Sequence, residues 1–230
     1  MISLFSYKCI VCGGITANSL GICAPCEFEL PVLNNYCNVC AEPLYLGITK
    51  CGPCLVKNIF YVSTKVQFYY SAPIDNLIIK LKFGHDLTGA KILGNLLANS
   101  LIQSEILEKP EIIVPVPLHP HRLHTRGYNQ ALEIALPIAK KLSIPLDRFS
   151  VTRIKNTMAQ AQLGAKDRID NIRSAFRVKK SFNYRHVAVV DDVITTGHTV
   201  MELAKTLYLH GVSRIDVWCC AKRSSQSDTT

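Results

Sequence analysis

The sequence of residues 187–199 is Val187-Ala188-Val189-Val190-Asp191-Asp192-Val193-Ile194-Thr195-Thr196-Gly197-His198-Thr199. Its first four residues are small, apolar and mostly β-branched, which predicts a buried strand, because the run is too short and too branched for a helix. Two adjacent carboxylates follow at the carboxyl end of this strand. Open parallel sheets hold their ligand crevice at that end of the strands. The order of residues therefore predicts a parallel α/β sheet with a ligand site beside the acidic pair.

The run from Thr195 to Thr199 has the composition of an anion-binding turn. Its residues are short, and the apolar residues of the next segment, 200–207, have helical spacing. Such a turn points backbone N–H groups and hydroxyls at one anion, beside the positive end of a helix. Gly197 lets the backbone approach a ligand closely, since it has no Cβ. The alternative is an ordinary strand, turn and helix with solvated aspartates, but the flanking pattern favours a sugar-phosphate site.

The same stretch resembles the phosphoribosyl-pyrophosphate (PRPP) motif of type I phosphoribosyltransferases. The resemblance implies that Asp191 and Asp192 bind the ribose hydroxyls of PRPP, and that Mg²⁺ bridges ribose and pyrophosphate oxygens. It also implies that the following loop holds the 5-phosphate of the ligand. The residues of this loop are Thr195, Thr196, Gly197, His198 and Thr199.

The size and charge of the chain limit the classes of protein that it can belong to. Its 230 residues allow one or two domains with a substantial core. The formal net charge is +9, and residues 122–185 contain fourteen Lys or Arg against four Asp or Glu. Such a segment suits a polyphosphate or a nucleic acid, although many basic faces are simply solvated. Because no apolar run has membrane-spanning length and no signal-peptide pattern opens the chain, we expect a soluble, cytoplasmic protein without membrane insertion.

Eight of the ten cysteines form four Cys-x-x-Cys pairs at a strict fourteen-residue interval. Two such pairs complete a tetrahedral Cys₄ metal site, so the repeat predicts two sites. The segment has many Gly and Pro residues and few apolar ones, so metal binding would supply much of its folding free energy. Four thiolates favour structural zinc, and an iron–sulfur cluster is the alternative. The predicted ligands are Cys9, Cys12, Cys23, Cys26, Cys37, Cys40, Cys51 and Cys54.

The spacing leaves the pairing of these ligands open. Sequential sites would join the first two pairs and the last two pairs, whereas a cross-braced arrangement would interleave them. Sequential pairing is the favoured alternative. The two remaining cysteines, Cys219 and Cys220, have no partner pair and are expected in the core of a final strand.

Strand and helix patterns alternate along the rest of the chain, which supports a parallel α/β sheet. Three alternating prolines in residues 115–122 predict a stiff loop, because a helix cannot continue through them. Pro137 is expected to kink or interrupt a later helix. Other strands are expected near residues 62–71, 112–114, 151–152, 175–178 and 215–220, and other helices near residues 73–81, 88–106 and 200–207.

Further motifs, taken together with the acidic pair, resemble the ComF/GntX family. These motifs are Pro115-Val116-Pro117-Leu118-His119, Arg122, Arg126-Gly127-Tyr128-Asn129-Gln130, Arg153, Thr157, Gln160, Arg168 and Asn171. The resemblance covers essentially the whole chain. It implies a double zinc-ribbon domain over residues 1–57, a phosphoribosyltransferase-like domain over residues 58–222 and a disordered tail over residues 223–230.

The family resemblance also implies roles for individual residues. Pro117, Leu118 and His119 match the pyrophosphate loop, which lacks here the basic residue that true transferases often place there. Arg122 and Arg126 could supply that charge from just downstream. Residues 155–162 are expected to form a flexible lid. The catalytic residues, if the chain is an active enzyme, would be Arg126, Asp191 and Asp192.

Structural roles are the alternatives for some of these residues. Surface ion pairs would explain Arg122 and Arg168, and a position at the start of a helix would explain Asn129 and Gln130.

Two functions remain open at this point. Proteins of the ComF branch are associated with natural competence, so the resemblance implies a protein that binds single-stranded DNA and PRPP or a related nucleotide, with other DNA-uptake proteins as candidate partners. Tyr128 and Phe176 are candidate stacking platforms for bases, although core packing suits Phe176 better. The alternative is an active phosphoribosyltransferase, a pentosyl glycosyltransferase that transfers ribose 5-phosphate from PRPP to an unidentified acceptor. The sequence has no recognisable pocket for an acceptor base, which favours the binding function.

Overall fold

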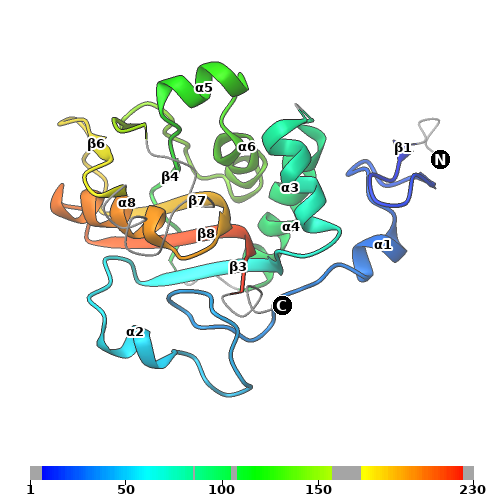
Figure 1. The fold of residues 1–230 in the computed structure, drawn as a ribbon, viewed down its shortest axis with the longest axis horizontal. Helices are drawn as coiled ribbons and strands as arrows, with labels where there is room; N and C mark the ends of the chain where they lie inside the picture. Colours follow the sequence, from blue (N-terminus) through cyan, green and yellow to red (C-terminus); the bar gives the residue numbers. More distant parts are fainter. Residues whose placement is uncertain (1–6, 85, 105–107, 157–171, 225–230) are drawn as a thin grey trace.

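A four-stranded parallel sheet forms the centre of the molecule in the computed structural model, which describes residues 7–84, 86–104, 108–156 and 172–224 (Figure 1). The strand order is β3, β8, β7, β4, and each neighbouring pair is parallel. The predicted parallel α/β sheet is thus confirmed. The strands are β3 (Ser63–Tyr69), β4 (Ile112–Pro115), β7 (His186–Ile194) and β8 (Arg214–Lys222).

Strand β7 is longer than the sequence predicts. It continues through the acidic pair as far as Ile194, because β8 pairs with it over this whole length and ends opposite it at Lys222. The neighbour on the other side, β4, pairs with β7 from Ile112↔Val187 to Pro115↔Val190. Strand β7 therefore extends beyond Val190, where its pairing with β4 ends. The acidic pair lies in this extension, which has a neighbouring strand on the β8 side.

Helices cover both faces of the sheet, and the side chains of β7 and β8 alternate between them. Ala188, Val190 and Trp218 pack with α3 (Ile74–Phe83), α4 (Thr88–Gln103) and α6 (Gln130–Leu142) on one face. Val189 and Val217 pack with α8 (His198–Leu209) on the other. Continuous apolar strands of this kind are typical of parallel sheets covered on both faces.

Two helices differ from the sequence-based prediction. Helix α6 continues through Pro137, which packs so closely against α4 that a Cβ on Gly94 would lie 2.5 Å from its Cγ. Helix α5 (Pro120–Arg126) lies partly within the predicted stiff loop. Pro120 occupies the first helical position, where a missing N–H group is tolerated, and the side chain of His119 caps the helix by accepting a hydrogen bond from the His121 N–H group at 3.2 Å.

Both halves of the cysteine-rich segment contribute residues to the apolar clusters on the two faces of the sheet. It contains β1 (Tyr7–Lys8), β2 (Ile15–Thr16), α1 (Ala24–Phe28) and α2 (Gly52–Val56). Residues of the first half, including Ile22 and Leu30, join the apolar cluster of α3 and α4. Residues of the second half, including Leu33 and Val39, join the cluster of α8. The domain boundary at residue 57 stays a prediction.

A short antiparallel ribbon completes the described structure. Its strands are β5 (Val151–Arg153) and β6 (Phe176–Val178), with Thr152 opposite Arg177. Most of the predicted lid, residues 157–162, lies outside the described residues, as do Arg168, Asn171 and residues 225–230 of the predicted tail. No helix in the described parts of the chain is both long enough and apolar enough to cross a membrane.

Candidate functional site

The acidic pair is divided by the alternation of strand β7. Asp192 is buried, with 7% of its surface exposed, and its Oδ2 lies 2.8 Å from the Nζ of Lys82 in α3. Asp191 is less buried and lines a small pocket together with the loop that follows β7. The Oδ1 atom of Asp191 accepts the Asp192 N–H group, and that of Asp192 accepts the Val193 N–H group, each at 2.9 Å. One carboxylate is therefore held inside the protein, while the other lines the pocket.

The two carboxylates have pKa values shifted in opposite directions. Burial raises the pKa of Asp191 well above its ordinary value, and the charge of Asp192 acts in the same direction. Burial would also raise the pKa of Asp192, but the nearby ammonium of Lys82 outweighs it and holds this pKa below its ordinary value. The pKa of Lys82 is raised, because the attraction of Asp192 exceeds the effect of burial. Lys82 also lowers the pKa of Asp191, but this effect is smaller than those of burial and of Asp192.

Two arginines, Arg126 and Arg153, interact electrostatically with this pair, and both also interact with Arg122. Burial, and then the charge of Arg122, lower the pKa of Arg153 to about 10, while Asp191 acts in the opposite direction. Burial also lowers the pKa of Arg126, which Asp192 in turn raises. These mutual effects put the three guanidinium groups and the two carboxylates in one electrostatic neighbourhood. Such a crevice can receive a ligand that carries both hydroxyls and a polyphosphate.

The loop after β7 joins the strand to a helix through a left-handed glycine and lies beside a pocket. Gly197 has a φ of +76°, a left-handed conformation that favours glycine, and α8 begins at the next residue. The pocket beside the loop is lined by Asp191, Val193, Ile194, Thr195, Gly197, Thr199 and Val200. Thr196 is exposed, and its hydroxyl lies 3.0 Å from the Nδ1 atom of His198. The structure thus brings Thr195, Gly197 and Thr199 together at one pocket beside Asp191.

The predicted pyrophosphate loop lies directly after β4. Pro117, Leu118 and His119 are partly exposed, and the side chain of His119 serves as the cap of α5. Asn129 caps α6 by accepting the Ala131 N–H group at 3.1 Å, and it donates to the Val116 carbonyl at 3.0 Å. Asn129 therefore has a structural role at the start of a helix, and it also fixes the backbone beside the predicted loop.

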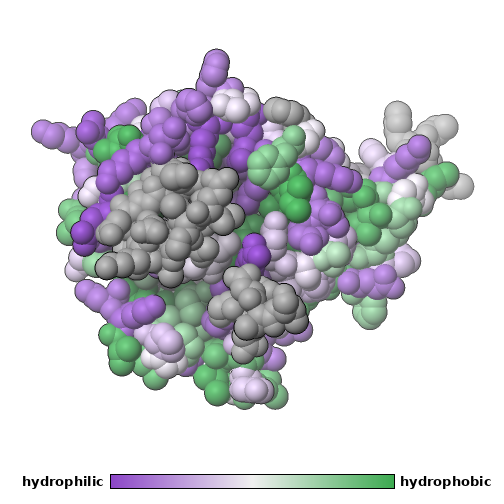
Figure 2. Space-filling model, viewed as in Figure 1, coloured by the Kyte–Doolittle hydropathy of each residue, from purple (hydrophilic) through white to green (hydrophobic). Residues whose placement is uncertain are grey.

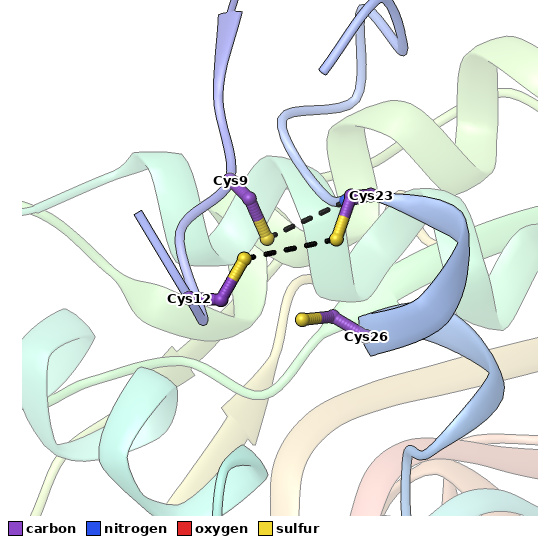
Figure 3. A group of neighbouring side chains, drawn as sticks. All are labelled: Cys9, Cys12, Cys23 and Cys26. Carbon is purple, nitrogen blue, oxygen red and sulfur yellow. Dashed lines mark hydrogen bonds between the residues drawn. The ribbon is translucent and has the colours of Figure 1, made fainter. Parts of the chain in front are cut away.

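The eight cysteines of the N-terminal segment form two clusters, of which Figure 3 shows the first. Cys9, Cys12, Cys23 and Cys26 form the first, and Cys37, Cys40, Cys51 and Cys54 form the second, with the four Sγ atoms of each group within 4.8 Å of one another. The sequential pairing is thereby confirmed over the cross-braced one. The Sγ atoms of Cys12 and Cys23 are 3.8 Å apart, and those of Cys40 and Cys51 are 3.6 Å apart. Four sulfurs at a Zn–S distance of about 2.3 Å in a tetrahedron lie about 3.8 Å apart, so both clusters fit structural zinc.

The two clusters repeat each other at an interval of twenty-eight residues. In both clusters the sulfur of the first cysteine accepts a hydrogen bond from the backbone N–H group of the third. Cys23 donates to Cys9 and Cys51 donates to Cys37, each at 3.4 Å. Hydrogen bonds of this kind orient metal ligands. A left-handed residue follows each second cysteine, namely Gly13 with φ +75° and Ala41 with φ +58°. Ala41 is fully buried, and a non-glycine residue in this conformation persists only where its surroundings impose it.

Sequence reasoning missed three residues of interest. Lys82 lies more than a hundred residues before Asp192, so only the tertiary structure reveals their ion pair. Arg153 belongs to one of the family motifs, but its electrostatic interaction with Asp191 is not apparent from the sequence. Phe149 is 64% exposed, and the guanidinium of Arg148 lies 4.7 Å from the centre of its ring. The sequence signal that could have identified Phe149 is an aromatic residue within a basic segment.

The stacking candidates named from the sequence are less accessible than Phe149. Phe176 is 5% exposed, as its expected core position requires. Tyr128 is partly buried, and its hydroxyl donates a hydrogen bond to the Leu81 carbonyl. Cys219 and Cys220 are fully buried in β8, which confirms their place in the core.

Comparison with known proteins gives relatives along nearly the whole chain. The chain is 35% identical over 229 residues to "Competence protein F" of Haemophilus influenzae, covering 96% of this chain and 100% of that protein. It is 33% identical over 205 residues to "DNA utilization protein YhgH" of Escherichia coli K12, covering 88% of this chain and 90% of that protein. Residues 2–55 match the family described as "Double zinc ribbon domain".

A solved structure with a weaker similarity is that of a glutamine phosphoribosylpyrophosphate (PRPP) amidotransferase from B. subtilis, complexed with ADP and GMP. The TM-score is 0.36 at 19% sequence identity, and the match covers 55% of this chain and 25% of that chain. A similarity of this size carries no argument about ligand or activity.

Proposed function

The chain belongs to the family of competence protein F and DNA utilization protein YhgH, and from this membership we propose that it acts in the uptake or utilisation of DNA. It would bind single-stranded DNA on its basic segment and a phosphoribosyl ligand of the PRPP type in the crevice beside Asp191. One observation carries the second half of this proposal. A carboxylate and a glycine-containing loop line one pocket at the end of a parallel strand, and the charges of Arg126 and Arg153 act on the acidic pair.

Each part of a PRPP-type ligand has matching groups in the crevice. Asp191 would accept hydrogen bonds from the ribose hydroxyls, and the loop of residues 195–199 would hold the 5-phosphate with its amides and hydroxyls. Arg122, Arg126 and Arg153 would neutralise the pyrophosphate. Mg²⁺ prefers carboxylate and phosphate oxygens, so Asp191 together with the ligand would hold it and spread the negative charge. Asp192 would contribute indirectly, by keeping Lys82 beside the site.

Single-stranded DNA has a suitable surface on the β5–β6 ribbon. Basic side chains are exposed along and beside it, and Figure 2 shows hydrophilic residues along the upper edge of the face that contains α5 and β6 in Figure 1. Phe149 lies exposed within this basic surface, where a base could stack on its ring. The exposed cations of the ribbon are Arg148, Lys155, Arg173, Arg177, Lys179 and Lys180. The cysteine-rich segment, with two Lys against three Glu up to Val56, is the less suitable surface.

Charge reversal on the ribbon tests the DNA-binding proposal. A variant with Arg177→Glu, Lys179→Glu and Lys180→Glu is expected to bind single-stranded oligonucleotides at least tenfold more weakly, because fewer neutralised phosphates release fewer counterions. The slope of log affinity against log salt should become shallower by about 0.7 for each phosphate that the variant no longer neutralises. Phe149→Ala should weaken binding by about 1–3 kcal/mol without changing that slope. Fluorescence anisotropy across a salt series measures both quantities.

A matched control separates the ribbon from general charge effects. Lys57, Lys65 and Lys80 lie outside the basic segment, and reversing them changes the net charge by the same amount. This control variant should keep most of its affinity. Equal losses in both variants, or equal affinity of the unmutated protein for heparin, would contradict a DNA-binding surface on the ribbon.

An active phosphoribosyltransferase is the second candidate. The observation that favours it is the opposite shift of two neighbouring pKa values. Asp192 is buried and ion-paired with a lowered pKa, whereas the partly buried Asp191 has a raised pKa, and active sites often set two titratable groups apart in this way. Transfer of ribose 5-phosphate from PRPP would release pyrophosphate. Incubation with PRPP, Mg²⁺ and a panel of bases therefore distinguishes transfer from binding alone.

A further inference from the structure

The side chain of Lys222 connects the second cysteine cluster to the loop after β7. Lys222 is the last residue of β8 and is 3% exposed. Its Nζ donates to the carbonyls of Thr195 and Arg223, each at 2.7 Å, and lies 3.0 Å from the Oε2 atom of Glu42. An ammonium has three donors, and these three partners use all of them. A buried cation thus joins a carboxylate of the cysteine-rich segment to the backbone of the candidate anion-binding loop.

Glu42 is fixed by the second cysteine cluster. It lies two residues after Cys40, and its backbone carbonyl accepts the Cys37 N–H group at 2.8 Å. The preceding residue, Ala41, is the buried left-handed residue of this cluster. The position of the Glu42 carboxylate therefore depends on the cluster keeping its shape, which in turn depends on the metal.

At the other end of this connection, Lys222 fixes a peptide group of the loop. In a trans peptide the N–H group points opposite to the carbonyl. The Thr195 carbonyl is directed at Lys222, so the N–H group of Thr196 must point to the other side. The Arg223 N–H group also donates to the Ile194 carbonyl at 2.9 Å, which attaches the start of the loop to the end of β8. The direction of the loop amides is therefore set from β8.

The first cysteine cluster has no equivalent carboxylate. The residue equivalent to Glu42 in the first cluster is Gly14, twenty-eight residues earlier. Its carbonyl accepts the Cys9 N–H group at 2.7 Å, just as the Glu42 carbonyl accepts the Cys37 N–H group. The backbone geometry is repeated, but the side chain that could reach Lys222 is present in the second cluster alone. The connection is thus specific to one of the two metal sites.

We infer that Lys222 is a positioning residue for the anion-binding loop, that Glu42 holds it in place, and that the second zinc site thereby supports ligand binding. This inference rests on the proposed function of the loop. Without Glu42, the buried ammonium of Lys222 would lose its counter-charge, and a buried unpaired charge is strongly unfavourable. The side chain would move towards water and release the Thr195 carbonyl. The loop would then lose its fixed amide directions while keeping all of its own residues.

The test compares Glu42→Gln with Glu29→Gln, which removes an exposed carboxylate from the first half of the cysteine-rich segment. Ribose 5-phosphate is the probe for binding, and amide chemical shifts of ¹⁵N-labelled protein report the loop directly. Glu42→Gln is expected to retain two zinc ions, to bind the probe roughly tenfold more weakly and to shift the amides of Thr196 and Gly197. Glu29→Gln should change neither quantity. Lys222→Met should resemble Glu42→Gln, and the double variant should show no further loss.

Each outcome decides a separate question. If Glu42→Gln keeps two zinc ions, the original affinity and the original loop amide shifts, the inference is overturned. If the unmutated protein does not bind ribose 5-phosphate, the proposed function of the loop fails, and the amide shifts alone still decide whether Glu42 sets the shape of the loop. If Lys222→Met does not fold, Glu42→Gln carries the test, because it preserves the size of the side chain and its backbone hydrogen bond.

Discussion

Asp192→Asn is expected to lower the free energy of unfolding by about 2–3 kcal/mol at neutral pH, because it leaves Lys82 without its partner in a mostly buried position. This value lies below the range for fully buried pairs, since the Lys82 side chain is 26% exposed. Asp191→Asn is expected to have the opposite sign and to stabilise the ligand-free protein. Burial and the charge of Asp192 both disfavour the ionised Asp191 carboxylate, and an amide removes that penalty. The two variants form a matched pair, because each asparagine keeps the Oδ1 atom that accepts a backbone N–H group.

The pH dependence of the two variants follows from their opposite pKa shifts. The pKa of Asp192 is lower in the folded state, so its stabilisation is present above the unfolded pKa of about 3.9 and is lost as the pH falls through the folded value. The penalty from Asp191, whose folded pKa is raised, is absent below about pH 3.9 and grows as the pH rises towards the folded value. Denaturant unfolding between about pH 3 and pH 8 measures both effects. A loss of equal size in the two variants would contradict the division of roles between the carboxylates.

Loss of the second zinc site is expected to lower the yield of soluble, folded protein more than loss of the first. Cys51→Ser removes one ligand of a cluster whose Cys37 and Cys54 are buried in the same apolar core as Val189 and Val217. Cys23→Ser removes the equivalent ligand of the first cluster, whose Cys12 is exposed. Both variants should contain about one zinc per chain in place of two. Cys51→Ser should also give mostly insoluble protein, because the core between the sheet and this cluster would open, whereas Cys23→Ser should leave a soluble, folded fraction.

Metal analysis and the soluble yield of freshly purified, reduced protein check this prediction. A conservative control is Cys219→Ala, which removes a buried thiol that belongs to neither cluster. It should keep two zinc ions per chain. The unmutated protein with one zinc or none, or a Cys51→Ser variant as soluble as Cys23→Ser, would contradict the account of the second cluster.

Local patterns in the sequence predicted the elements of the fold and the metal sites well. The apolar run before Asp191, the Thr-Thr-Gly turn and the Cys-x-x-Cys repeat are each contained in a short segment, and their chemistry depends on near neighbours. The pairing of the cysteine clusters needed the structure, because the spacing alone is compatible with two arrangements. The length of β7 was underestimated, since it depends on how far β8 continues beside it.

The contacts that tune the site could not be predicted, because they join residues far apart in the sequence. Lys82 reaches Asp192 from α3, and Lys222 reaches Glu42 from the opposite end of the chain. A lysine in a helix or at the end of a strand has no local feature that distinguishes an ion pair from a solvated side chain. Folding alone brings these charges together, and burial then decides their effect on the carboxylates and on the loop.

The central claim is that the crevice beside Asp191 binds a phosphoribosyl ligand. Calorimetric titration of PRPP with Mg²⁺ into the ligand-free protein, repeated with Asp191→Asn, tests it most directly. We expect saturable binding of one ligand per chain to the unmutated protein, and a loss of at least tenfold in affinity for the variant even though the variant is the more stable of the two. Absence of saturable binding at millimolar PRPP, or equal affinity of the two proteins, would contradict the claim.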